Sequence, residues 1–249
     1  MHEQGGLPIP GIHHIGQPDW WAEGGDMTPE DFGLKRAKEL EAAIEELGVD
    51  RVAAFIAEPV QGAGGVIIPP STYFPEIQRI CDEHGILLIA DEVITAFGRT
   101  GNMFGTTTMD LTPDMLVCAK GLSSAYLPIS ALMVNARVFD VISEESDRVG
   151  VFGLSFTYSG HPVSAAVARE ALRIYEDENI VEHVRAMEPH FLGGLKKLLD
   201  HPLVGEVRGK GLLAGVELVH DKSTGEAFDP ANQVGTYCAD HAEAHGVIL

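Results

Sequence analysis

The feature that most constrains the fold is a series of unbroken apolar segments separated by helical patterns. The apolar segments occupy residues 51–60 (RVAAFIAEPV), 86–93 (ILLIADEV) and 115–119 (MLVCA). Strands without alternating polar residues are typical of parallel sheets that are buried on both faces. Helices between such strands complete an α/β arrangement. The sequence therefore predicts a mostly parallel sheet with helices on both faces.

The two helical patterns between these segments carry clear end signals. The first begins with Thr28 as an N-cap and Pro29 in the first helical position, and Gly48 ends it. The second covers residues 73–84 and stops at Gly85. Side-chain oxygens and proline favour helix starts, whereas glycine favours helix ends.

The second half of the chain has a different pattern. The segment 129–135 (ISALMVN) follows the strand 115–119 too closely for a helical crossover, so we expect it to be antiparallel. Residues 162–200 predict one very long helix or two helices joined at Pro189. Residues 205–219 predict a strand hairpin in a smaller domain.

These patterns predict two domains. Residues 1–165 form a larger domain, in which residues 1–27 show no hydrophobic periodicity and are interpreted as a loop or an extended arm. Residues 166–249 form a long helical segment and a second, smaller domain.

Composition narrows the functional class. The 249-residue chain has a net charge of −20, which disfavours binding to phosphate backbones, so no nucleic-acid partner is expected. The widely spaced Cys81, Cys118 and Cys238 resemble neither a disulfide framework nor a zinc site. No signal segment or membrane-length apolar run is evident. We therefore expect a cytoplasmic protein that does not bind membranes.

Three of the predicted strands end in charged residues, namely Glu58, Asp91 and Lys120. Ligands of open α/β sheets bind at the carboxyl ends of the strands, so these side chains are expected at one crevice. Each of them alone is more simply read as a solvated strand end. Together they fit chemistry on pyridoxal phosphate, which needs a lysine for the Schiff base and an acid opposite the pyridine nitrogen. Lys120 and Asp91 fill these two roles.

Other motifs give weaker alternatives. The glycines at 62, 64 and 65 partly match a dinucleotide-binding loop, but the third position of that motif is Ile67. The segment 156–162 (FTYSGHP) is read equally well as a phosphate-binding helix start or an ordinary capping turn. Metal binding by the adjacent His13 and His14 is disfavoured, because neighbours on an extended chain point in opposite directions.

Four segments together resemble the class III pyridoxal-phosphate-dependent aminotransferases, and most of all the ω-amino acid and amine:pyruvate enzymes. They are AEPVQGAGGVIIPP (57–70), LLIADEVITAFGRTG (87–101), LVCAKGLSSAYLPISALMV (116–134) and FTYSGHPVSAAVA (156–168). The resemblance implies the fold type I architecture of pyridoxal-phosphate-dependent transferases. Residues 1–165 would then be the second half of the cofactor-binding large domain, and residues 166–249 an interdomain helix and an incomplete α+β small domain. Ile94 stands where a subset of the class that includes the GABA enzymes has glutamine, which argues against that subset.

The resemblance also implies roles for individual residues. Lys120 would be the Schiff-base lysine and would shuttle a proton, while Asp91 would pair with the pyridine nitrogen. Val93 would pack against the cofactor ring. Thr157 would bind the cofactor phosphate of the neighbouring subunit, which implies a homodimer with a shared active site. Glu58 would lie near the substrate.

The implied activity is transfer of an amino group from an amine or ω-amino acid to a keto acid such as pyruvate. Members of the family are much longer, so the chain looks like a fragment that lacks N-terminal and C-terminal parts. Two alternatives stay open on the sequence alone. The first is a catalytically impaired fragment that only takes part in interaction or dimerisation. The second is another reaction of the same cofactor, such as that of an aminomutase.

Overall fold

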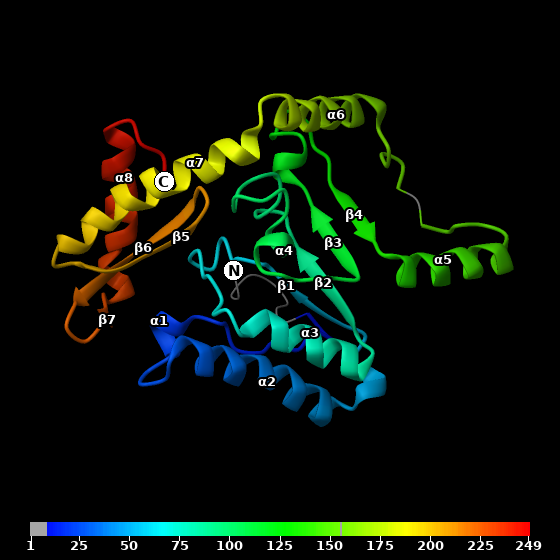
Figure 1. The fold of residues 1–249 in the computed structure, drawn as a ribbon, viewed down its shortest axis with the longest axis horizontal. Helices are drawn as coiled ribbons and strands as arrows, with labels where there is room; N and C mark the ends of the chain where they lie inside the picture. The colour runs from blue at the N-terminus through cyan, green and yellow to red at the C-terminus, as the bar shows by residue number, and fades with distance from the viewer. Residues whose placement is uncertain (1–8, 155) are drawn as a thin grey trace.

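The larger of two sheets contains the predicted apolar strands. The computed structural model describes residues 9–154 and 156–249. The strands lie in the order β1-β2-β3-β4 (Figure 1). They are β1 (Ala54–Ala57), β2 (Leu87–Asp91), β3 (Met115–Cys118) and β4 (Ala131–Val134). The first three are mutually parallel and β4 is antiparallel to β3, which confirms the predicted α/β class and the reversal at the last strand.

Helices α2 (Pro29–Leu47) and α3 (Tyr73–His84) pack on one face of this sheet and enclose the main core. Their ends agree with the predictions. The Thr28 hydroxyl oxygen accepts a hydrogen bond from the amide of Asp31 at 3.2 Å. Gly85 ends α3 in the left-handed conformation, with φ of 68°.

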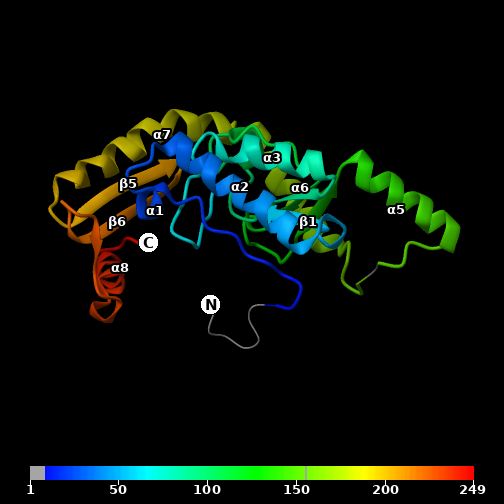
Figure 2. The same cartoon turned by 90° about the horizontal axis from the view of Figure 1, so that it is seen from below.

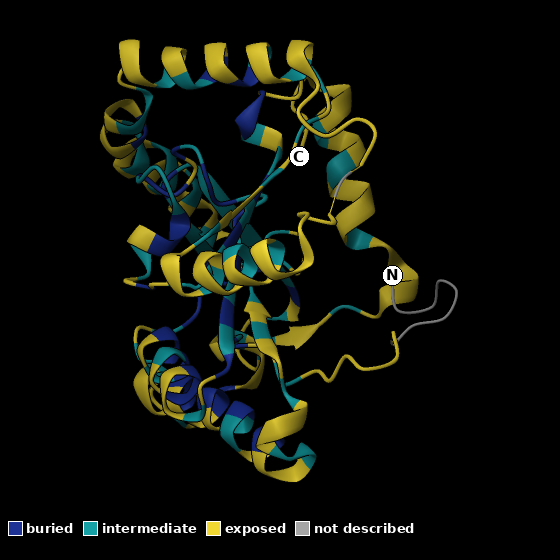
Figure 3. Cartoon of the chain, turned by 90° about the vertical axis from the view of Figure 1, so that its right-hand side faces the viewer, coloured by how far each residue is buried: buried dark blue, intermediate teal, exposed yellow. Residues whose placement is uncertain are grey.

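The two faces of the sheet differ in burial. Leu88 and Ala90 of β2 point into the core and are fully buried. On the opposite face, Ile56 of β1 and Leu132 of β4 are 58% and 52% exposed. Helical cover of the second face is therefore partial. Figure 3 shows exposed residues on the outer sides of the helices, on loops and on part of the sheet.

Helices α6 (Pro162–Asp177) and α7 (Ile180–Lys196) lead from the large sheet to the smaller one (Figure 1). The predicted joint at Pro189 is wrong, because Pro189 lies inside α7. The helical segment is interrupted instead at Asn179, which adopts the left-handed conformation with φ of 51°. Asparagine enters that conformation at lower cost than most residues. The predicted domain boundary at 165 falls within α6.

The smaller sheet is antiparallel, with the order β5-β6-β7. Its first two strands form the predicted hairpin, and α8 follows β7 along the chain (Figure 1). These elements are β5 (Val204–Lys210), β6 (Leu213–Asp221), β7 (Glu226–Ala227) and α8 (Val234–Ala244). Among the helices of the described ranges, none combines the length and the apolarity needed to cross a bilayer.

Helices α1 (Trp20–Glu23), α4 (Gly105–Thr108), α5 (Ala136–Val149) and α8 were not indicated by the sequence patterns. The short α1 interrupts the expected N-terminal arm, whose first eight residues lie outside the described ranges. Helix α5 projects from one end of the molecule in both Figure 1 and Figure 2.

Candidate functional site

Glu58, Asp91 and Lys120 lie at the carboxyl ends of three adjacent parallel strands. Glu58 directly follows β1, Asp91 is the last residue of β2, and Lys120 follows β3 after Ala119. The strand register aligns Ala57 with Ala90 and Asp91 with Val117, so the strand ends meet at one edge. This is the edge at which open α/β sheets bind their ligands.

Lys120 begins a tight, conformationally strained loop. It opens the single 3₁₀ turn Lys120–Leu122 and has a positive φ of 38°. Ser124 and Ala125 are also left-handed, with φ of 48° and 61°. Such a conformation costs a residue with a Cβ atom about 1–2 kcal/mol. The carbonyl of Lys120 accepts amide hydrogen bonds from Ser123 and Ala125, at 3.2 and 3.3 Å, which close the loop on itself.

The Lys120 loop borders an open cavity of about 690 Å³ between the end of the large sheet, helices α6 and α7, and the start of β6. The volume is in the range of small-molecule and cofactor sites. Of the predicted site residues, Val93 and Lys120 line the cavity, whereas Glu58, Asp91 and Thr157 do not. Other lining residues include Phe97, Ser124, Ala125, Tyr175, His183 and Leu213.

The carboxylates of Asp91 and Glu58 have distinct local roles. The Asp91 Oδ1 atom accepts a hydrogen bond from the Val93 amide at 3.0 Å, which fixes the direction of this half-buried carboxylate. The Glu58 Oε2 atom accepts a hydrogen bond from the Gly62 amide at 2.9 Å. Glu58 thus anchors the glycine-rich loop to the end of β1.

The glycine-rich loop does not form a dinucleotide-binding turn. It is closed by reciprocal backbone hydrogen bonds between Gln61 and Ile67, and α3 begins only at Tyr73. The Gly65 carbonyl accepts hydrogen bonds from Nε and Nη2 of Arg208, at 2.9 and 2.6 Å. The loop is therefore a contact between the two sheets.

Thr157 lies on an exposed segment between α5 and α6, away from the residues that line the Lys120 cavity. Further along the chain, His161 is the N-cap of α6 and Pro162 is its first residue. Within a single chain, Thr157 and Lys120 are therefore not brought into one site.

Glu92 is a buried residue that the sequence predictions missed. It is 0% exposed, and its carboxylate accepts three hydrogen bonds. The donors are the amides of Gly105 and Thr106, at 2.8 and 2.6 Å, and the hydroxyl of Thr95 at 2.5 Å. The first turn of α4 (Gly105–Thr108) has no side-chain cap of its own, so Glu92 satisfies its free amides. The one sequence feature that could have indicated this role is the second acidic residue in the segment ADEV (90–93), directly after Asp91.

Tyr175 is the second missed residue, and it contacts the Lys120 loop from α6. Its hydroxyl is 2.6 Å from the Gly121 carbonyl oxygen. Its ring stacks on Phe97 with the centroids 5.9 Å apart and the planes at 20°. No local pattern indicates this contact, because 54 residues separate Tyr175 from Gly121.

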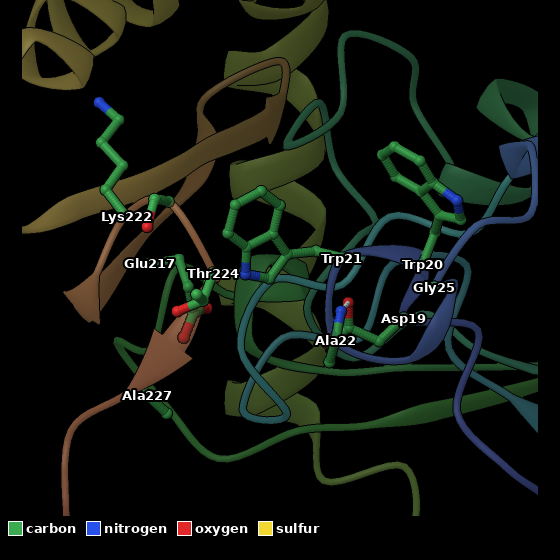
Figure 4. Close-up of a pocket in the computed structure, with 11 residues that line it drawn as sticks. Asp19, Trp20, Trp21, Ala22, Gly25, Glu217, Lys222, Thr224 and Ala227 are labelled. Carbon is green, nitrogen blue, oxygen red and sulfur yellow. Dashed lines mark hydrogen bonds between the residues drawn. The ribbon is translucent and has the colours of Figure 1, made fainter.

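A second open cavity, of about 610 Å³, lies between α1 and the hairpin of β6 and β7 (Figure 4). Its acidic groups are already engaged: Asp19 accepts a hydrogen bond from the Ala22 amide, and Glu217 accepts one from Arg208. Lys222 points away from the two tryptophans (Figure 4). None of the predicted site residues lines this cavity.

The chain belongs to the class III aminotransferases. A sequence model of the family "Aminotransferase class-III" matches residues 2–249. The relatives include the putrescine–pyruvate aminotransferase of Pseudomonas aeruginosa, which is 50% identical over 100% of this chain and 54% of that protein. A probable γ-aminobutyrate transaminase 3 of rice is 48% identical over 100% of this chain and 49% of its own length. The chain thus spans about half the length of the curated relatives it matches.

Solved transaminases share the fold. The ω-transaminase of Pseudomonas jessenii in complex with PMP has a TM-score of 0.96 and 46% identity, over 99% of this chain and 55% of that one. A transaminase described with L-Ala has a TM-score of 0.95 and 49% identity, over 99% of this chain and 58% of that one. Proteins named γ-aminobutyrate transaminase are also among the relatives. The argument from Ile94 against the GABA enzymes stays a prediction.

The residues at the strand ends fit the cofactor that the family uses. Pyridoxal phosphate needs a primary amine that can reach its aldehyde and a carboxylate for its ring nitrogen. Lys120 is exposed to the cavity, and no ion pair engages its amine within residues 9–154 and 156–249. Asp91, held by the Val93 amide, ends the neighbouring strand.

Proposed function

We propose that the whole protein catalyses pyridoxal-phosphate-dependent transamination through Lys120. The observation that carries the proposal is the position of the Lys120 amine, at a cofactor-sized cavity beside the strand that ends in Asp91. Membership of the class III aminotransferases supports the same reaction class. Bound pyridoxal phosphate would supply an aldehyde and an electron-withdrawing ring.

Each predicted residue has a role in this proposal. The Nζ atom of Lys120 would bind the cofactor and carry the proton that leaves the substrate carbon. The Asp91 carboxylate would keep a proton on the ring nitrogen. Val93, which lines the cavity, would contact the ring. Glu58 would act indirectly, by holding the glycine-rich loop at the substrate side.

The proposed substrates are an amine or ω-amino acid as donor and a keto acid such as pyruvate as acceptor. The proposal rests on the names of the relatives, which include a putrescine–pyruvate aminotransferase and ω-transaminases. We also propose a cytoplasmic location, because the chain is acidic and its three cysteines are unpaired thiols.

We further propose that two copies share the site. Helix α5 and the segment after it expose many large apolar side chains, and Thr157 lies in the same segment. The exposed residues include Phe139, Val141, Val151, Phe152, Leu154 and Phe156, at 56–71% exposure. Apolar surface of this extent is typical of a protein interface. A second copy that covers it would bring its Thr157 toward the phosphate of the cofactor.

The test is covalent trapping of the cofactor. The purified chain is incubated with pyridoxal phosphate, reduced with borohydride, digested and mapped by mass spectrometry. We expect a saturable label on Lys120 that is absent from Lys120→Ala and retained in Lys35→Ala, which alters an exposed lysine on α2. Equal labelling of wild type and Lys120→Ala would refute the proposed role. Separate portions of the same proteins, loaded with pyridoxal phosphate but neither reduced nor digested, are assayed with putrescine and pyruvate for alanine formation.

A further inference from the structure

The loop that carries Lys120 needs external support for its backbone. Lys120, Ser124 and Ala125 all have positive φ, although each carries a Cβ atom. The left-handed region is unfavourable for such residues, so a loop that adopts it three times within six residues must be held by contacts around it.

The Tyr175 hydroxyl supplies two such contacts. It donates a hydrogen bond to the Gly121 carbonyl oxygen at 2.6 Å. Because the single hydroxyl proton is used there, the Ser124 hydroxyl, 2.8 Å away, donates to the tyrosine oxygen. The one phenol group therefore connects the first and the second half of the loop.

The Tyr175 ring is itself fixed from the opposite side. It stacks on Phe97, whose side chain also lies against Gly121: a Cβ atom at residue 121 would be only 3.0 Å from Cδ2 of Phe97. Phe97 packs on Phe104 with the ring centroids 6.0 Å apart. The phenol is thus part of a rigid aromatic cluster and has little freedom to leave the loop.

We propose that Tyr175 is a positioning residue for Lys120. Its hydroxyl holds the strained loop in the conformation that directs the lysine side chain into the cavity. The lysine's chemical role rests on the proposed function, whereas the control of the loop by Tyr175 is a property of this chain alone. Tyr175 does not touch the reacting atoms in this proposal and acts only through Gly121 and Ser124.

The first test needs no cofactor. Trypsin cleaves after lysine, so the rate of cleavage of the Lys120–Gly121 bond, followed by mass spectrometry, reports loop opening. Tyr175→Phe keeps the ring and removes only the hydroxyl. We expect it to accelerate this cleavage about tenfold, which corresponds to roughly 1.4 kcal/mol, the sum of two modest hydrogen bonds. Tyr126→Phe, a matched change at an exposed tyrosine of the same loop, is expected to leave the rate unchanged.

A general loss of stability would have a different signature. It would accelerate cleavage at every lysine and arginine, whereas loss of loop control affects the Lys120 bond selectively. An unchanged rate at this bond in Tyr175→Phe, or an equal acceleration at all sites, overturns the proposal. This result stands whether or not the chain binds pyridoxal phosphate.

The second test reports the direction of the lysine. Visible circular dichroism of the bound cofactor depends on its fixed orientation, whereas absorbance reports only its amount. We expect Tyr175→Phe to lower the ratio of dichroism to absorbance, and Tyr126→Phe to preserve it. A wild-type chain without Lys120 labelling would refute the proposed function. A labelled Tyr175→Phe chain with an unchanged ratio would refute the positioning role instead.

Discussion

Replacement of Glu92 by alanine is expected to be among the most damaging single changes in the large sheet. Glu92 is fully buried and accepts hydrogen bonds from two backbone amides and one hydroxyl. Alanine would leave the amides of Gly105 and Thr106 without an acceptor, at about 1–3 kcal/mol each. A small cavity adds to this loss. We therefore expect the free energy of unfolding to fall by about 3–5 kcal/mol, a large share of a typical 5–15 kcal/mol.

Glutamine at this position refines the test. The Glu92 Oε2 atom serves Thr95 and Gly105, whereas Oε1 serves Thr106 alone. The side-chain oxygen of glutamine can take the place of Oε2 and accept the hydrogen bonds from Thr95 and Gly105. Its NH2 group then takes the place of Oε1 and faces the Thr106 amide, so two hydrogen-bond donors oppose each other. The expected loss for Glu92→Gln is about 2 kcal/mol, the value of one hydrogen bond to a charged acceptor.

The assay is urea unfolding followed by circular dichroism, with equal slopes required for comparison between variants. Glu46→Ala, at an exposed position of α2, is the control and should change stability by less than about 0.5 kcal/mol. A loss below about 1 kcal/mol for Glu92→Ala would show that the three hydrogen bonds are not decisive. An equal loss in the Ala and Gln variants would contradict the assignment of separate roles to the two oxygens.

Two further outcomes follow from burial and backbone geometry. Burial, with smaller contributions from Asp82 and Asp114, raises the pKa of the Cys81 thiol to about 12. Burial also raises the pKa of the Cys118 thiol. Both thiols therefore stay protonated at pH 8. A maleimide should therefore label the exposed Cys238 first, and rapid labelling of all three thiols in the native chain would contradict this. Gly211 has φ of 61°, and a Cβ atom there would collide with a backbone carbonyl oxygen, so Gly211→Ala should lower the urea midpoint. Gly150→Ala, with positive φ but open space, should cost only about 1 kcal/mol.

Local signals were sufficient for much of the large sheet. The second helix was predicted at residues 73–84, and α3 has those bounds because apolar spacing and the Gly85 stop are encoded within one segment. The antiparallel β4 followed from connection length alone. The placement of Glu58, Asp91 and Lys120 at one edge of the sheet could also be predicted, because neighbouring parallel strands have their carboxyl ends at the same edge.

Features that depend on contacts between distant residues could not be predicted in this way. Tyr175 reads as an ordinary helix residue until the fold places it against Gly121, 54 positions earlier. The left-handed Asn179 separates α6 from α7 as the N-cap of α7, whereas Pro189, the stronger local signal, is accommodated within α7. A single local hydrogen bond is lost at an internal proline, and the contacts of a packed helix can offset that loss.

Backbone strain gives an argument for the site that is independent of family resemblance. Within the described ranges, eight residues other than glycine have positive φ. Four of them, Phe97, Lys120, Ser124 and Ala125, line the cavity of about 690 Å³ at the end of the large sheet. Strain persists only where the surrounding structure imposes it, and it concentrates at functional sites. Glycine at 120 would relieve the strain at that position but would remove the amine. The structure thus retains an unfavourable backbone conformation at the one position where the proposed chemistry requires a lysine.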